Sequence, residues 1–345
     1  MRSRWPLALV VLGVALASVR CARDMDATTR RWWSHVEILA SDRMEGRDTG
    51  SEGYRRAGRY VVEQFVRAGL KPAGEIGYYQ PVPLRAWRLR ADRSAVELFG
   101  PDGPRPLRLF HDVTISVGAA LPVRVDAGLV FVGAPEDVGA VDVAGKIVVQ
   151  FAPPRFLAGA QSPVVAVLPP GAAGLLWIES TEGPEPRIWP APYAVTMTLA
   201  ESSPVRETAG ALDIRLNPAS AAPLFDGSGH TFEDLAARAA RHEPLPNLAL
   251  RSRLRATFVT EGAELTSDNI VAALPGSDPE QALDYVVVSA HLDGYGRGTP
   301  RAGDGVYNGA LDNAGSVATV IGLAERLERT RPRRSVLFPV TTGEE

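Results

Sequence analysis

Cysteine is almost absent from this chain of 345 residues, in which Cys21 is the only one. Beyond the N-terminal segment the chain therefore has no disulfide to form. An excess of charge is also lacking, because the formal net charge is −3, so nucleic acid and acidic surfaces are not expected as partners. No apolar run is long enough to cross a bilayer as a helix. With 45% hydrophobic residues, the chain can bury one large core or two moderate cores.

The N-terminus has the pattern of an export signal. Arg2 and Arg4 precede an apolar stretch at 7–17, which ends in the small-x-small sequence of a cleavage site. We therefore expect residues 1–23 to be a signal peptide and the protein to be periplasmic or extracellular. Lipid anchoring at Cys21 is the less favoured alternative, because a lipoprotein signal has a small residue before the cysteine and this chain has an arginine there.

The rest of the chain divides into three parts that differ in composition and hydrophobic pattern. Residues 24–85 predict two helices, the second capped by Ser51 and closed by Gly69. Residues 86–262 contain short β-branched runs separated by Gly, Pro and Asp turns, which predict a compact β-rich insert. This insert has no cluster of catalytic residue types, so a binding or shielding role is favoured.

Residues 263–345 predict strands alternating with a helix, and hence an α/β fold with a mixed sheet sandwiched by helices. The strand predicted at 335–340 is almost uniformly apolar. Such uniformity predicts burial on both faces of the sheet.

Three polar groups follow these predicted elements. His291-Leu292-Asp293 comes directly after an apolar run, Asp312-Asn313 precedes the predicted helix, and Glu344-Glu345 follows the strand at 335–340. Two of the groups stand at the C-terminal ends of strands expected to be parallel, where open α/β sheets place their chemistry. An imidazole with several carboxylates is a ligand set that zinc prefers.

Each group taken alone has a plainer explanation. His291 can simply end a strand, Asp312 can cap the helix, and Glu344 and Glu345 can be solvated acids. Chemically, Asp293 can accept a hydrogen bond from the N–H of the His291 ring and so orient the imidazole, and Asp312 can bridge two cations with its two oxygens. Adjacent glutamates on an extended segment diverge, so one can bind a metal while the other takes a proton from water.

The conjunction of the three groups in this order closely resembles the M28 family of zinc metallopeptidases, most of which are aminopeptidases. The resemblance rests on the segments 288–293, 303–314 and 343–345, and on the loop Met44-Glu45-Gly46-Arg47-Asp48-Thr49-Gly50-Ser51. The insert resembles a protease-associated domain through segments at 130–133, 142–148 and 171–174. The resemblance thus covers nearly all of the chain after the signal segment.

The resemblance implies a role for each site residue. His291 would bind one zinc, Glu345 would bind a second, and Asp312 would bridge the two ions. Glu344 would be the general base, and Asp293 would orient His291. The resemblance also implies a cis peptide bond at Asp312–Asn313 and peptide or protein N-termini as substrates.

The family pattern also includes a further acidic ligand and a second histidine after the Glu-Glu pair. The remaining histidines lie outside any family motif: His35, His111, His230 and His242. We therefore expect this chain to be an incomplete fragment with little peptidase activity of its own, and the strand at 335–340 to form an open apolar edge.

Two alternatives remain for the function. One is a non-catalytic, peptidase-like binding protein, which the retained acids and histidine disfavour. The other is an acyltransferase of the glutaminyl-cyclase kind, which the insert and the Asp312-Asn313 motif disfavour.

Overall fold

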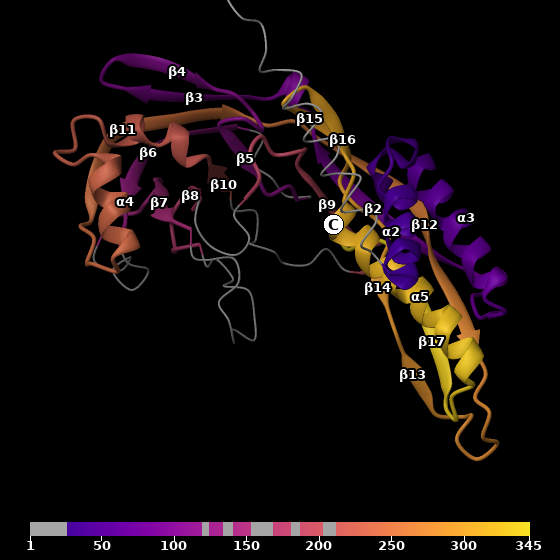
Figure 1. Ribbon diagram of the computed structural model, residues 1–345. Coiled ribbons are helices and arrows are strands. Elements are labelled where there is room, and N and C mark those ends of the chain that lie inside the picture. The colour runs from indigo at the N-terminus through magenta and orange to yellow at the C-terminus, as the bar shows by residue number, and fades with distance from the viewer. Residues whose placement is uncertain (1–25, 119–123, 134–140, 153–167, 181–186, 203–211) are drawn as a thin grey trace, which may run out of the picture. The chain divides into compact units, whose positions relative to one another are not determined.

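The computed structural model describes residues 26–118, 124–133, 141–152, 168–180, 187–202 and 212–345. The predicted signal peptide at 1–23, with Cys21, lies outside these ranges. Contacts divide the chain into two compact units (Figure 1). The first unit comprises Met1–Pro81, Ser267–Gly296 and Tyr307–Glu345, and the second comprises Val82–Thr266 and Arg297–Val306.

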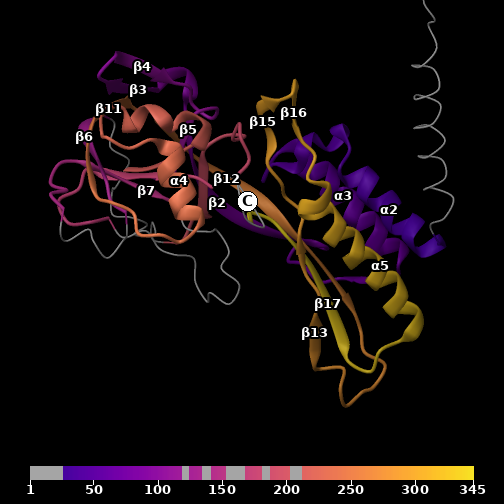
Figure 2. The ribbon, with the colours of Figure 1, turned by 60° about the vertical axis from the view of Figure 1, so that its left-hand side comes forward.

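Three helices cover one face of the sheet in the first unit (Figure 2): α2 (Ala27–Leu39), α3 (Glu52–Arg67) and α5 (Gly315–Thr330). The second predicted helix is confirmed, because the Ser51 hydroxyl accepts a hydrogen bond from the amide of Tyr54 and caps α3. Buried side chains then recur on one side of α3 at helical spacing: Tyr54, Ala57, Val61 and Phe65. Burial of this stripe against the sheet stabilises the helix.

The sheet of the first unit is built around β17 (Ser335–Thr341). This strand pairs antiparallel with β12 (Thr260–Leu274), and parallel with β13 (Tyr285–Val287) and β14 (Ala290–His291). The short β1 (Lys71–Pro72) pairs antiparallel with β12. The mixed pairing agrees with the predicted α/β class.

Burial in this sheet differs from the prediction made from apolar composition. In β17, Val336, Phe338 and Val340 are buried, whereas Leu337 and Pro339 are only half-buried. The strand order makes β13, and not β17, the edge of the sheet. All three residues of β13 are exposed. The prediction of burial on both faces was wrong for the described residues, because their helices pack against one face only.

The second unit contains an eight-stranded sheet in the order β4-β3-β11-β6-β7-β8-β10-β5. Its middle strands are parallel: β6 (Arg124–Phe131), β7 (Ile147–Phe151), β8 (Gly174–Ile178) and β10 (Leu212–Leu216). The flanking strands are β3 (Ala95–Gly100), β4 (Gly103–Leu107), β5 (Val113–Ile115) and β11 (Leu248–Thr257). Helix α4 (Phe232–Ala240) begins after the Thr231 cap. The assignment of residues 86–262 to a protease-associated domain stays a prediction.

Two further strand pairs complete the description. Strand β2 (Tyr79–Leu89) pairs antiparallel with β9 (Val195–Leu199). Strands β15 (Gly296–Arg301) and β16 (Asp304–Tyr307) form a separate two-stranded sheet, most of which belongs to the second unit. The sequence pattern did not indicate that residues 297–306 would group with residues 82–266. In the described part of the chain, no helix has both the length and the apolarity needed to cross a membrane.

The one-sided burial predicts that substitutions in β17 and in the neighbouring β13 lower the free energy of unfolding by very different amounts. Phe338→Ala should lower the free energy of unfolding by about 3–5 kcal/mol, because the Phe338 ring is fully buried and 6.2 Å from the Phe65 ring. Val287→Ala should cost less than about 1 kcal/mol, because Val287 is exposed. Urea titration of both variants measures the contrast, and equal losses would contradict the one-sided packing.

Candidate metal centre

His291 reaches the site because its strand is paired directly with β17. In the parallel register of β14 and β17, His291 lies opposite Thr341. The next amide, that of Leu292, donates to the Thr341 carbonyl at 2.9 Å, and the Leu292 side chain is fully buried. These contacts fix the backbone on both sides of the imidazole. Glu344 and Glu345 follow β17 at the same end of the sheet.

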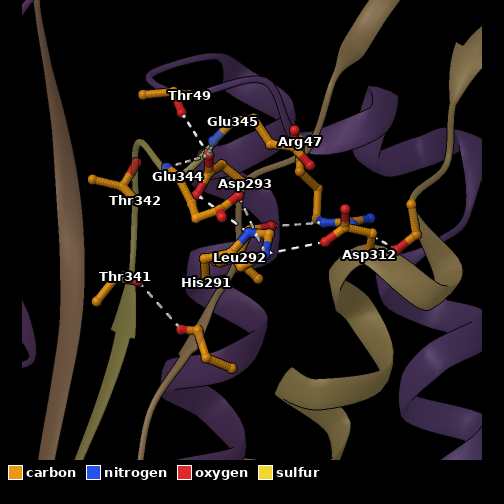
Figure 3. Close-up of polar contacts among 12 residues, drawn as sticks. Arg47, Thr49, His291, Leu292, Asp293, Asp312, Thr341, Thr342, Glu344 and Glu345 are labelled. Atoms are coloured by element: carbon orange, nitrogen blue, oxygen red, sulfur yellow. Dashed lines mark hydrogen bonds and ion pairs between the residues drawn. The ribbon is translucent and has the colours of Figure 1, made fainter. Parts of the chain in front are cut away.

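The side chains of Asp312 and Glu344 approach the imidazole of His291 (Figure 3). The Nε2 atom of His291 lies 3.1 Å from Asp312 Oδ1 and 3.7 Å from Glu344 Oε2. The His291 side chain is 12% exposed, while those of Asp312 and Glu344 are 62% and 59% exposed. The imidazole is therefore held in the protein, and the two carboxylates stand on the open side of the site.

Asp312 lies in a single π-helical turn, Ala310–Ala314, directly before α5. The backbone dihedrals of Asp312 and Asn313 are not helical, and the peptide bond between them is cis, as the family resemblance implied. The amide of Ala314 donates to the Gly309 carbonyl at 3.1 Å and closes the turn around Asp312.

Asp293 is fully buried beneath the other acids. Its Oδ2 atom accepts hydrogen bonds from the amides of Glu344 and Glu345, at 2.9 and 3.1 Å, and from the Thr49 hydroxyl at 3.2 Å. Asp293 thereby holds the backbone of both glutamates.

The hydrogen bond expected between Asp293 and His291 is not formed in the structure. Asp293 Oδ1 and His291 Nδ1 are 3.8 Å apart, which is too long, and both atoms are buried without another partner. The reason is geometric, because Oδ2 is already held by the three donors and keeps the carboxylate back from the ring.

Glu345 has a strongly perturbed side chain. Its Oε1 atom is buried without a hydrogen-bond partner. Burial is the main cause that raises the pKa of Glu345 to about 7; the nearby charges of Asp312 and Glu344 add to the rise, while a hydrogen bond from Tyr295 and the proximity of His291 oppose it. Like-charged neighbours and partial burial together disfavour the ionised carboxylate.

The structure thus brings His291, Asp312 and Glu344 into contact, with Asp293 below them and Glu345 electrostatically coupled to them. Within the described ranges, no group of three or more His, Cys, Asp or Glu side chains has an arrangement that could hold a metal ion as it stands. The donor set nevertheless suits zinc in kind, since it combines an imidazole nitrogen with carboxylate oxygens. The unpartnered Glu345 Oε1 atom is a further donor of the same class.

Analysis of the sequence missed two residues that support the site, Thr49 and Arg47. Thr49 donates to Asp293, and the fully buried Arg47 donates from Nε to the Leu292 carbonyl at 2.8 Å. Burial lowers the pKa of Arg47 to about 10, while the nearby Asp293, Asp312 and Glu345 oppose this fall. The only signal in the sequence was that both residues lie in the 44–51 loop.

Comparison with known proteins supports the family resemblance. Residues 269–345 match the model of peptidase family M28. The chain is similar in structure to an aminopeptidase from Aneurinibacillus sp. strain AM-1, with 17% identity, a TM-score of 0.52, and coverage of 91% of this chain and 62% of that chain. The zinc aminopeptidase BSAP from Bacillus subtilis matches with 16% identity, a TM-score of 0.46, and coverage of 92% and 62%. No curated protein matches the sequence.

The likeness to the Aneurinibacillus enzyme confirms the α/β fold class, and at this identity it shows the fold alone. This chain spans 62% of the length of each of the two solved structures. The predicted resemblance to family M28 is confirmed by the family model over residues 269–345, while the roles of the individual site residues stay predictions.

The raised pKa of Glu345 predicts that the metal-free chain loses stability as the pH rises. With a folded-state pKa of about 7 against a reference value of 4.5, the folded chain keeps a proton that the unfolded chain releases. The stabilising contribution is therefore complete below the reference pKa and is lost as the pH rises through 7. Glu345→Gln should remove this dependence. Urea titrations between pH 4.5 and 7.5, with a chelator present, measure the difference between the two proteins, and a constant difference would contradict the assignment.

Proposed function

Because residues 269–345 match peptidase family M28, we propose that this protein is a zinc-dependent exopeptidase of the aminopeptidase type. The observation that carries the proposal is the meeting of His291, Asp312 and Glu344 from three separate segments, with His291 Nε2 at 3.1 and 3.7 Å from the two carboxylates. The similar fold of the Aneurinibacillus aminopeptidase supports the same class.

We assign the binding of zinc to His291, Asp312 and Glu345. The imidazole and the carboxylates are donors of the kind zinc prefers, and the two oxygens of Asp312 suit a bridge between two ions. When bound, zinc polarises the carbonyl of the scissile peptide bond and lowers the pKa of water at the site.

Glu344 is assigned as the general base. Its side chain is 59% exposed, so water and a substrate can reach it, and it lies 3.7 Å from the imidazole of the site. Its carboxylate takes a proton from the water that attacks the carbonyl carbon of the peptide bond. The same proton then passes to the departing amine nitrogen as the carbon–nitrogen bond breaks.

Asp293 acts by holding its neighbours in place. Its buried carboxylate accepts from the amides of both Glu344 and Glu345, so one group sets the direction of the base and of a ligand. Displacement of either glutamate by about 1 Å is enough to slow catalysis strongly.

The remaining assignments concern the rest of the chain. Peptide or protein N-termini are the proposed substrates. We assign residues 86–262 to a protease-associated-like insert and residues 1–23 to an export signal, which places the protein in the periplasm or outside the cell.

The proposal predicts zinc-dependent hydrolysis by the whole protein. An aminoacyl p-nitroanilide should be cleaved, and its N-acetylated counterpart should not, because an aminopeptidase requires a free α-amine. Glu344→Gln should lower kcat by about 100-fold or more, as expected for loss of a general base, and should leave zinc affinity nearly unchanged. Initial rates and a competition assay with a chromogenic chelator measure the two quantities.

Two variants serve as controls. His291→Ala should weaken zinc binding, and Glu280→Gln, which changes an exposed glutamate outside the site, should change neither rate nor affinity. Equal cleavage of the acetylated substrate would exclude the aminopeptidase type. Full activity in Glu344→Gln would exclude the proposed base.

A further inference from the structure

Arg47 is the largest charged side chain with no exposure to solvent in the described part of the chain. All four of its hydrogen bonds go to main-chain carbonyls. No carboxylate of the described residues forms an ion pair with it, although Asp293, Asp312 and Glu345 are its nearest electrostatic partners. A buried cation without an ion-pair partner is costly, so its position here calls for a structural or functional reason.

The four carbonyls belong to three segments of the chain. Nε donates to Leu292, between His291 and Asp293, at 2.8 Å. Nη1 donates to Leu39 at the end of α2, at 2.6 Å, and to Asn308 at 2.7 Å. Nη2 donates to Gly309, at the start of the turn that carries Asp312, at 2.9 Å. One rigid guanidinium therefore ties the backbone of the His291 segment to that of the Asp312 turn.

The local backbone is shaped to admit this side chain. Gly46 and Arg47 both have left-handed φ angles, of +69° and +60°, which for arginine is a strained conformation. A Cβ atom on Gly46 would collide with the Gly296 carbonyl, and one on Gly309 would come within 2.7 Å of Arg47 Nη2. The approach of the Gly309 turn to the guanidinium thus depends on a residue without a side chain, and so does the packing of Gly46 against Gly296.

We propose that Arg47 is a positioning residue of the metal centre, which fixes the His291 segment against the Asp312 turn and balances the buried negative charge beside them. This inference rests on the proposed function. Arginine suits the task because its planar fork offers five donors in a fixed geometry, whereas lysine offers one centre that cannot span three segments.

The positioning role of Arg47 is tested first without metal. Arg47→Met keeps much of the volume and removes both charge and donors. Hydrogen exchange in the segments around Leu292 and Ala314 should become at least about 10-fold faster than in the unaltered protein, because Arg47 no longer restrains them. Exchange in the middle of α3, around Val61, should change much less.

The second measurement is zinc affinity, by competition with a chromogenic chelator and with the whole protein. Arg47→Met should weaken zinc binding by about 10- to 100-fold, the range found when groups that orient metal ligands are removed. Arg47→Lys keeps the charge but lacks the planar set of donors. It should restore less than half of the lost zinc affinity, measured as the logarithm of the dissociation constant. It also provides a second variant if Arg47→Met does not fold.

Arg56 offers a matched control. It binds the same 42–47 turn, through the Arg43 carbonyl at 2.8 Å and Glu45 at 2.6 Å, and it contacts neither the His291 segment nor the Asp312 turn. Arg56→Met should leave exchange at Leu292 and Ala314, and zinc affinity, within about twofold of the unaltered protein, because a surface ion pair contributes little.

The outcomes separate this inference from the function on which it rests. Zinc binding that is lost in His291→Ala but unchanged in folded Arg47→Met would overturn the role of Arg47 and leave the proposed function intact. Equal effects of Arg47→Met and Arg56→Met would also overturn it, because both would then report only the stability of the turn. Absence of zinc binding in the unaltered protein would overturn both.

Discussion

The parallel pairing of β14 with β17 is the constraint on which the site depends. With His291 opposite Thr341, the imidazole and the Glu344-Glu345 pair come to the same end of the same sheet. Neither segment reaches the other by local structure, since they are separated by α5 and its preceding turn. The hydrogen bond from Leu292 to Thr341 and the burial of Leu292 maintain this register. A slip of one residue would turn His291 to the opposite face.

Charge is distributed in the site by depth. Asp293 and Arg47 are both fully buried, and each is satisfied mainly by backbone groups: amides for the carboxylate, carbonyls for the guanidinium. Asp312 and Glu344 are more than half exposed. The buried layer therefore sets geometry, while the exposed carboxylates remain accessible to solvent and substrate. Asp293 and Arg47, which would touch no substrate, are therefore the most deeply buried charged groups of the site.

The first unit also shows how far apolar composition can mislead. Positions 336–340 of β17 are all apolar, yet only alternate ones are buried, and the three residues of the neighbouring β13 are exposed. Composition reports which residues prefer to leave water. It does not report whether a second layer is present among the described residues to receive them.

The sequence by itself determined the local elements and the chemistry. Ser51 and the apolar stripe of α3 specify a capped helix through contacts within a few residues. His291, Asp312 and the two glutamates could be recognised because their residue types and order carry the family likeness. Only the tertiary structure decided the approach of Asp312 to Nε2, the three donors on Asp293, and the reach of Arg47 to a carbonyl 245 residues away. Such contacts depend on how distant segments pack in space, and no local pattern in the chain encodes them.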